Sequence, residues 1–180
     1  NGLAGTGLGL LTYMADEQEL RSLTFWNMGS LAHGSWLEIG ILFPLIGMSL
    51  FFLNRKSGEL NALLLGDEQA HYLGIRVQEV KNSIVIWVSL AVGTSVALTG
   101  SIGFIGLMAP HLVRLTIGPD HRFLLPASAL MGAVLLLGSD LIARVIVQPG
   151  ELPIGIVTSA LGSPLFLWLL IKNRFGVMGS

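Results

Sequence analysis

The amino-acid sequence predicts an all-α protein, a polytopic transmembrane helical bundle with about five complete spans and a partial one. Hydrophobic residues make up 52% of the chain and charged residues only 12%, whereas soluble domains carry about 25% charged residues. The mean hydropathy of +0.73 agrees with this composition. A spanning helix needs about 20 apolar residues, so 180 residues can hold five spans and the loops between them.

Six apolar segments follow one another along the chain, and each is expected to form a helix. They lie at residues 3–14, 37–53, 84–99, 102–115, 123–142 and 154–171. The first is too short to span and begins without an initiator Met or a basic region. We therefore expect the end of a helix cut by truncation rather than a signal peptide. The fourth contains Pro110, which should bend or end its helix.

The most informative segment is LLLGDEQAHYLGI at residues 63–75, which places a polar helical motif between two apolar spans. It carries Asp67, Glu68 and His71, and it closes with Leu73-Gly74, a pair typical of helix ends. A loop that only joins two spans needs just a few polar residues. The extra helix therefore predicts a docking element, although the two acidic residues also complement a helix dipole.

The basic residues predict an orientation. If the loop around residues 63–75 is cytoplasmic, most lysines and arginines lie on the same side of the membrane, as the positive-inside rule requires. The inner residues are then Arg55, Lys56, Arg76, Lys81, Arg114, Arg122, Lys172 and Arg174, and the outer ones are Arg21 and Arg144. The expected outer connections are residues 16–36, a tight turn at Gly100-Ser101, and residues 145–153.

Asp140 is the most conspicuous polar residue within a predicted span. A carboxylate inside a bilayer is costly and by default suggests a functional role. Arg144 lies four residues later, on the same face of a helix. Two interpretations stay open: an ion pair that stabilises the outer helix end, or a pair with a function of its own.

A second polar group surrounds a predicted inner helix end. Its members are His111, Arg114, Asp120, His121 and Arg122. Two histidines and an aspartate could suggest a metal ion, but they straddle Gly118-Pro119 and nothing fixes a third ligand. We therefore expect a structural cluster that ties this helix end together, and no metal site.

Other chemistry has less support in the sequence. His33 beside Ser35 leaves open a membrane-embedded Ser/His hydrolase as the alternative class, although no nucleophile elbow or orienting carboxylate accompanies the pair. The absence of cysteine excludes thiol nucleophiles and thiolate metal sites. The chain contains no Gly-Lys dipeptide and hence no phosphate-binding loop.

Several motifs together resemble the FecCD-type permeases, the membrane subunits of bacterial ABC importers for iron-siderophore complexes, haem and cobalamin. The motifs are GDEQAHYLGI at 66–75, GSIGFIGL at 100–107, PHLVR at 110–114, DHR at 120–122, LLP at 124–126, DLIAR at 140–144, ELPIGI at 151–156 and GSPLF at 162–166. The similarity covers nearly the whole chain in the family's order and spacing. It implies that residues 1–180 correspond to the C-terminal part of a single permease domain, from the end of its fifth span to its tenth.

The resemblance also implies roles for residues. It identifies residues 60–80 as cytoplasmic coupling helices that contact a partner ATPase. The expected contact residues are Leu65, Gly66, Asp67, Glu68, Ala70, His71, Leu73 and Gly74. It further implies that Arg144 pairs with acidic residues of a periplasmic binding protein.

Partners and cargo follow from the same resemblance. It implies a second permease subunit, two cytoplasmic ATPases that hold ATP and Mg, a periplasmic binding protein and a multi-pass location in the bacterial inner membrane. No cofactor is expected on this chain itself. The outer segment ADEQELRSLTFWNMGSL at residues 15–31 resembles haem-type permeases more than cobalamin ones. The expected cargo is an iron chelate, either haem or a ferric siderophore.

Overall fold

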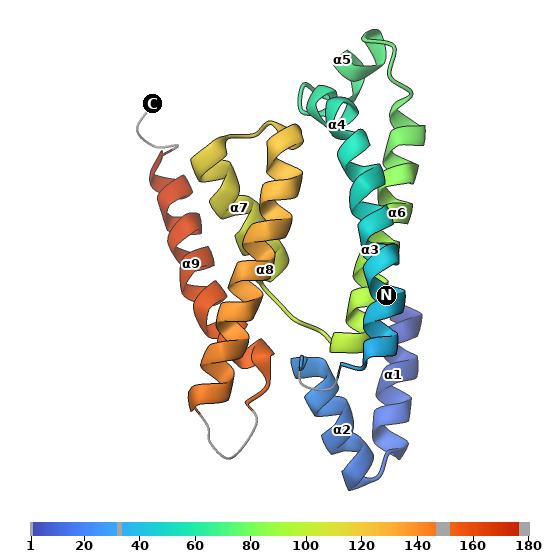
Figure 1. The fold of residues 1–180 in the computed structure, drawn as a ribbon, viewed down its shortest axis with the longest axis vertical. Helices are drawn as coiled ribbons and strands as arrows, with labels where there is room; N and C mark the ends of the chain where they lie inside the picture. The colour runs from blue at the N-terminus through green and yellow to red at the C-terminus, as the bar shows by residue number, and fades with distance from the viewer. Residues whose placement is uncertain (1, 32–33, 147–151, 177–180) are drawn as a thin grey trace.

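The structure is a computed structural model that describes residues 2–31, 34–146 and 152–176. These residues form α-helices and no β-strand, which confirms the all-α prediction (Figure 1). The helices are α1 (Gly2–Met14), α2 (Glu17–Met28), α3 (Trp36–Arg55), α4 (Ser57–Leu63), α5 (Asp67–Tyr72), α6 (Val77–Thr99), α7 (Ile105–Ile117), α8 (His121–Ile146) and α9 (Ile154–Gly176).

Three of these helices, α3, α6 and α8, are long and apolar enough to cross a membrane. Shorter apolar helices lie at Ile105–Ile117, which is α7, and at Ile154–Trp168 within α9. Together they form the polytopic helical bundle that the sequence predicted. Many large apolar side chains face outward, among them those of Phe43 and Leu130. Such exposure would be unfavourable in water and is ordinary for surfaces that lipid or other membrane helices cover.

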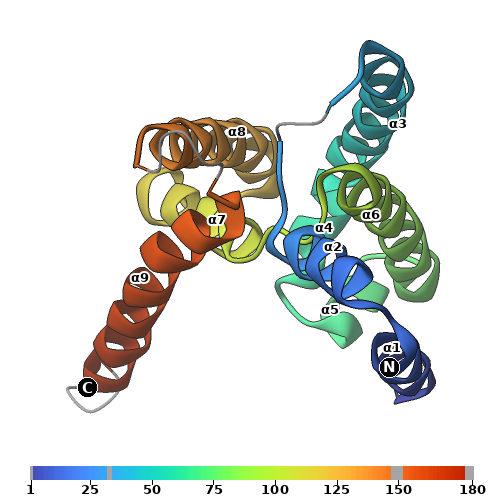
Figure 2. The same ribbon diagram turned by 90° about the horizontal axis from the view of Figure 1, so that it is seen from below.

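The helices form two groups, which Figures 1 and 2 show from two directions. In one group α3 packs along α6, where the rings of Phe52 and Trp87 stack with centroids 4.3 Å apart. In the other group α8 packs against α7 and α9. At Gly132 α8 lies against α7, since a Cβ atom there would lie 3.7 Å from that of Ala109, an ordinary van der Waals distance.

The ends of the bundle separate the basic residues as predicted. The α4–α5 segment, the turn between α7 and α8, and the C-terminal end of α9 lie together at the top of Figure 1. The turn between α1 and α2 and the C-terminal end of α8 lie at the opposite end. Arg55, Lys56 and Arg76 therefore lie at one end of the molecule, and Arg21 and Arg144 at the other. This arrangement is consistent with the expected orientation.

Three local predictions are refined or corrected by the structure. The connection at residues 16–36 contains a helix, α2, which begins at Glu17. Asp16 caps this helix, and its amide donates to Glu19 Oε2 at 3.1 Å, as in a capping box. The expected tight turn at Gly100-Ser101 is a longer link, because α7 begins only at Ile105. The alternative that Pro110 ends its helix is also wrong, since α7 continues through it to Ile117.

Candidate functional site

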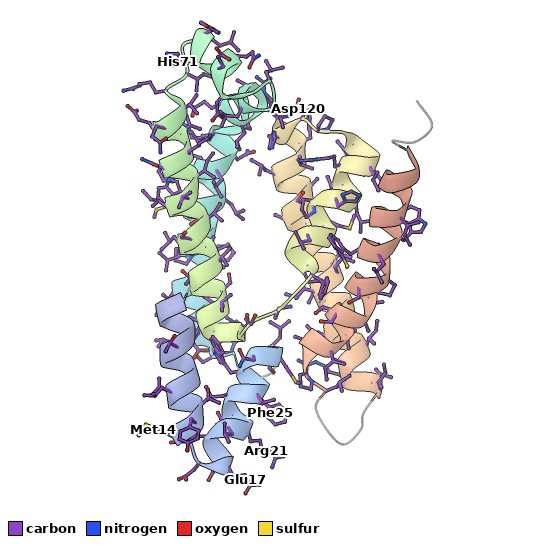
Figure 3. The ribbon with its side chains drawn as sticks, turned by 180° about the vertical axis from the view of Figure 1, so that it is seen from behind. Met14, Glu17, Arg21, Phe25, His71 and Asp120 are labelled. Carbon is purple, nitrogen blue, oxygen red and sulfur yellow. The ribbon has the colours of Figure 1, made fainter. Side chains whose placement is uncertain are left out.

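The first candidate surface is the α4–α5 pair, which connects α3 to α6. It forms the outermost part of its end of the bundle, and Figure 3 shows His71 there. Helix α4 follows α3 almost directly, and Lys56 at this junction pairs with Glu59 at 2.8 Å. Helix α5 is held to the start of α6 by an ion pair between Asp67 and Lys81. Because both partners of that second pair are exposed, it adds little stability.

Two glycines set the shape of this segment. Gly66 precedes α5 with φ of 105°, and a Cβ atom there would lie 2.7 Å from Gln69 Oε1. Gly74 follows α5 with φ of 82°, and the Ile75 amide donates to the Ala70 carbonyl at 3.1 Å. This six-to-one hydrogen bond is the Schellman closure of a helix. The helix stop predicted at Leu73-Gly74 is confirmed.

The predicted contact residues differ in accessibility. Leu65 and Leu73 are 62% and 64% exposed. Asp67, Glu68, His71 and Gly74 are also exposed, and Gly66 is half-buried. Ala70 differs from the rest, because its side chain is completely buried. In this structure Ala70 of α5 is therefore not part of the exposed surface, and its expected role as an ATPase contact stays a prediction.

This exposed surface is chemically mixed. Leu65, Tyr72 and Leu73 supply apolar area, and Asp67 and Glu68 add negative charge beside them. Apolar side chains surrounded by polar ones are typical of protein interfaces. The surface has no arrangement of groups suited to covalent chemistry. It can bind a folded partner.

The turn between α7 and α8 lies beside α4. Asn61 of α4 donates from Nδ2 to Asp120 Oδ1 at 2.6 Å, and its Oδ1 accepts from the His121 amide at 2.8 Å. The Arg122 amide also donates to Asp120 Oδ1, at 3.0 Å. The hydrogen bonds from the Arg122 amide and Asn61 hold the pKa of Asp120 below its ordinary value. Sequence reasoning missed Asn61, because nothing local indicates a partner about 60 positions away.

The side chains of His111, Arg114 and Arg122, the other members of the predicted inner cluster, do not form salt bridges with Asp120 in the described part of the chain. Arg122 bonds to Asp120 through its backbone amide. The side chain that bonds to Asp120 is that of Asn61, and not that of Arg114 or Arg122. His111 lies half-buried in α7, and its Nε2 is buried without a hydrogen-bond partner. Among the residues described, no three His, Cys, Asp or Glu side chains gather as a metal site.

At the opposite end, Arg144 Nε lies 2.8 Å from Asp140 Oδ2, one turn apart on α8. The arginine side chain is 57% exposed, whereas the aspartate is 20% exposed. The predicted pairing is therefore present. The arginine side chain as a whole stays more than half exposed at this end of the bundle.

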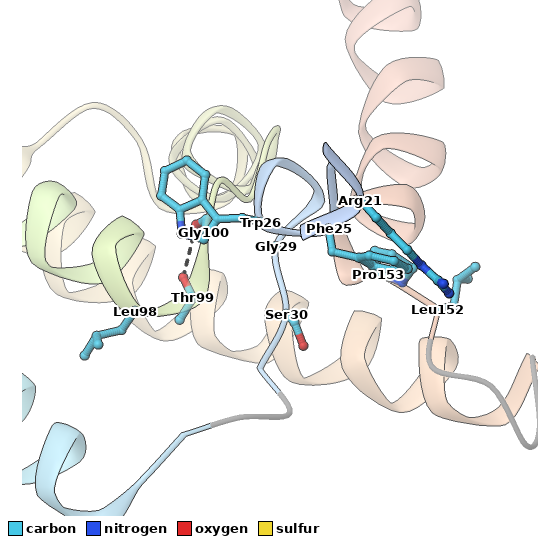
Figure 4. Close-up of a pocket in the computed structure, with 10 residues that line it drawn as sticks. All are labelled: Arg21, Phe25, Trp26, Gly29, Ser30, Leu98, Thr99, Gly100, Leu152 and Pro153. Carbon is cyan, nitrogen blue, oxygen red and sulfur yellow. Dashed lines mark hydrogen bonds between the residues drawn. The ribbon is translucent and has the colours of Figure 1, made fainter. Parts of the chain in front are cut away.

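A hollow that the sequence did not indicate lies beside α2 at this same end (Figure 4). Its volume is about 630 Å³. The residues lining it include Arg21, Phe25, Trp26, Thr99, Gly100 and Pro153. The Arg21 guanidinium lies 5.8 Å from the centroid of the Phe25 ring. The dashed line in Figure 4 marks the hydrogen bond of 3.3 Å from the Thr99 hydroxyl to the Gly100 carbonyl.

Close backbone approaches hold the end of α2 beside this hollow. The Ser30 amide donates to the Thr99 carbonyl at 2.8 Å, and the Ser101 amide donates to the Trp26 carbonyl at 3.2 Å. A Cβ atom at Gly155 would lie only 2.2 Å from the Met28 carbonyl oxygen. The C-terminal end of α2 is therefore packed against both the end of α6 and the start of α9.

Ser35, the serine of the Ser/His hydrolase alternative, has a structural role as a helix cap. Ser35 is the N-cap of α3, where its hydroxyl accepts from the Glu38 amide at 3.3 Å. The Ser35 amide donates in return to Glu38 Oε2 at 2.8 Å, which completes a capping box. His33 lies outside the described residues.

Comparison with known protein families matches residues 2–172 to the FecCD transport family. The chain belongs to the FecCD family. The resemblance drawn from the sequence motifs is thereby confirmed. Family membership and the three long apolar helices together identify this FecCD chain as a multi-pass membrane protein.

Two relatives of this FecCD chain are named for different cargoes. The chain is 46% identical over 174 residues to the hemin transport system permease protein HmuU of Yersinia pestis, covering 97% of this chain and 52% of the relative. It is 44% identical over 181 residues to the vitamin B12 import system permease protein BtuC of Vibrio cholerae, covering 96% of this chain and 54% of the relative. Neither relative is named as a hydrolase.

A solved structure has the same fold. It is described as an inward-facing conformation of an ABC transporter assigned to the metal-chelate type. The TM-score is 0.89 at 36% identity, and the match covers 95% of the FecCD chain and 56% of the solved one. The chain thus spans about half the length of the relatives that it matches.

Proposed function

We propose that this chain forms the C-terminal part of an ABC-importer permease subunit, which moves an iron chelate across the bacterial inner membrane. The observation that carries the proposal is the exposed α4–α5 surface at one end of a FecCD helical bundle. The compact pair of α4 and α5, in which Gly66 and Gly74 bound α5, can transmit a push as a single body. The chain itself has no phosphate-binding loop, so the energy must come from a partner.

The partners of the intact subunit follow from this role. Two cytoplasmic ATPases holding ATP and Mg bind the exposed residues of α4–α5, chiefly Leu65, Asp67 and Leu73. A second permease subunit completes the pathway, and lipid covers the remaining apolar surface. A periplasmic binding protein delivers the cargo and docks on Arg144, whose exposure at the opposite end of α8 supports this part of the proposal.

Haem or a ferric siderophore is the proposed cargo. The outer segment at residues 15–31 resembles haem-type permeases, and a relative with 46% identity is named for hemin transport. The competing cargo is cobalamin, since a relative with 44% identity is named for vitamin B12 import. Both are large ligands, so size alone does not discriminate between them.

Uptake measurements test the proposal directly. Cells that carry the intact operon are given radiolabelled haem, ferric siderophore or cobalamin, and a deletion of the permease gene is the control. We expect haem or ferric siderophore to accumulate only in cells with the permease. Accumulation of cobalamin alone would overturn the proposed cargo, and no permease-dependent accumulation of any of the three would overturn the proposed function.

A further inference from the structure

Asn61 joins two parts of the fold that are far apart in sequence. Its Nδ2 donates to Asp120 Oδ1 at 2.6 Å, and its Oδ1 accepts from the His121 amide at 2.8 Å. The His121 ring nitrogen Nδ1 lies 2.8 Å from the same oxygen. A carboxylate only accepts hydrogen bonds and a backbone N–H only donates them, so a single amide orientation satisfies both contacts.

Asp120 in turn fixes the start of α8. Its Oδ1 accepts from the Arg122 amide at 3.0 Å, and its carbonyl oxygen accepts from the Leu124 amide at 2.8 Å. Asp120 therefore acts as the N-cap of α8, because its carboxylate accepts from an amide in the first turn of the helix. Hydrogen bonds to a charged group are stronger than neutral ones. The Asn61 bond to Asp120 is therefore a firm connection between α4 and the first turn of α8.

The connection is made to α4, the first helix of the α4–α5 pair. Only residues 64–66 separate α4 from α5, and Asp67 of α5 pairs with Lys81 of α6. On its other side, α4 packs against α8. Figure 3 shows Asp120 at the same end of the molecule as His71.

We propose that Asn61 is a positioning residue that passes a displacement of the α4–α5 pair to α8. The proposal rests on the proposed function, in which ATPase subunits bind this pair. A contiguous set of hydrogen bonds from α4 through Asp120 to the first turn of α8 supplies the physical path. Without Asn61, α4 moves while the α7–α8 hairpin stays in place.

The test uses the intact subunit reconstituted in nanodiscs with the ATPase subunits of its operon. Amide hydrogen exchange of residues 118–125 is measured with and without MgATP and vanadate, and ATP hydrolysis and uptake are measured in proteoliposomes. The variants are Asn61→Ala, the exchanged pair Asn61→Asp with Asp120→Asn, and Asn82→Ala as the matched control. Asn82 is an exposed asparagine that accepts from Gln78 within α6 at 3.0 Å, so its loss removes a hydrogen bond without separating two helices.

In the wild type and in Asn82→Ala, nucleotide trapping should change exchange at residues 118–125. In Asn61→Ala that difference should disappear, and uptake per ATP hydrolysed should fall about five- to tenfold. The exchanged pair should restore part of both, because an amide at position 120 can donate to a carboxylate at position 61, although the nitrogen that donates no longer accepts from the Arg122 amide.

The contrary outcomes are distinct. A merely structural role would raise exchange equally with and without nucleotide and leave the trapping difference intact. That result, or unchanged uptake per ATP in Asn61→Ala, would overturn the role of Asn61. Failure of the wild-type subunit to bind the ATPases or to take up any ligand would instead overturn the proposed function.

Discussion

Arg144 lies near the C-terminal end of α8 and pairs with Asp140, one turn earlier on the same face. The ion pair itself is worth little, since the arginine is more than half exposed. Its effect is to orient a positive charge, while the less exposed aspartate lies beneath it. An accessible, oriented cation is suited to meeting an acidic protein surface.

Charge reversal of Arg144 should therefore slow docking of the binding protein. In the intact transporter, Arg144→Glu should reduce the association rate constant at low salt by up to about tenfold, because like charges then face each other. The association should also become less sensitive to ionic strength. Surface-binding kinetics of the purified binding protein measure both quantities, and reversing an acidic residue on that protein should restore part of the rate.

Asp140→Asn is the control for this experiment. It removes the negative partner but keeps the positive charge of Arg144, so association should remain within about twofold of wild type. If Arg144→Glu associates as fast as wild type at low salt, Arg144 is only the partner of Asp140. The docking role is then wrong.

At the scale of elements, α5 owes its geometry to the glycines at its two ends. Gly66 and Gly74 both have positive φ, where a side chain with a Cβ atom costs about 1–2 kcal/mol. Gly58 of α4 is exposed, has an ordinary helical conformation and meets no atom within 4 Å of a Cβ position. It is therefore a matched site without the conformational demand.

Replacing Gly66 or Gly74 with Val in the intact subunit should uncouple transport. We expect ligand-stimulated ATP hydrolysis and uptake to fall at least about fivefold, because α5 can no longer present its exposed side chains in the same geometry. Membrane insertion should be normal, since the apolar spans determine it. Gly58→Val should retain coupling. Unchanged hydrolysis and uptake in the first two variants would mean that the segment is only a connector.

The junction at the end of α2 depends on a different glycine property, the absence of a side chain. A Cβ atom at Gly155 would lie 2.2 Å from the Met28 carbonyl oxygen, and backbone atoms cannot move aside as a flexible side chain can. At Gly138 of α8, by contrast, a Cβ atom would meet nothing within 4 Å. The two positions separate steric crowding from helix propensity.

Gly155→Ala should destabilise the protein by about 1–3 kcal/mol, the usual cost of overpacking a close contact. Gly138→Ala should be neutral or stabilising, because alanine favours the helical state by roughly 0.5–1 kcal/mol over glycine. Thermal unfolding of the detergent-solubilised intact subunit measures both. Equal melting temperatures for Gly155→Ala and wild type would show that α2 is not packed tightly against α9.

Local sequence patterns predicted some of these elements and not others, for physical reasons. Runs of apolar residues indicated α3, α6, α8 and α9, because a spanning helix must be apolar along its own length. Helix α2 lacks such a run, so the sequence predicted only a connection at residues 16–36 and no helix within it. The Asn61 link and the Gly155 contact depend on residues that are distant in sequence. No single segment carries a signal for them, since each arises only when separate helices pack.

At the scale of the whole molecule, the two helix groups leave much apolar surface uncovered. The side chains of Trp36, Phe43 and Leu137 are exposed on long apolar helices. Lipid can cover such surfaces, but a translocation pathway needs helices on all sides of the cargo. The relatives that this chain matches are about twice as long. We therefore expect the remaining part of a permease subunit to pack on part of this surface.

The 180-residue chain alone should consequently transport nothing. Proteoliposomes that contain it with the partner ATPases and the binding protein should accumulate no more radiolabelled haem or ferric siderophore than vesicles without it. The intact subunit in the same preparation should accumulate the ligand when ATP is supplied. Adding the missing part as a separate chain should restore some uptake, because the exposed apolar faces would again be covered. ATP-dependent import by the 180-residue chain alone would show instead that these helices enclose a complete pathway.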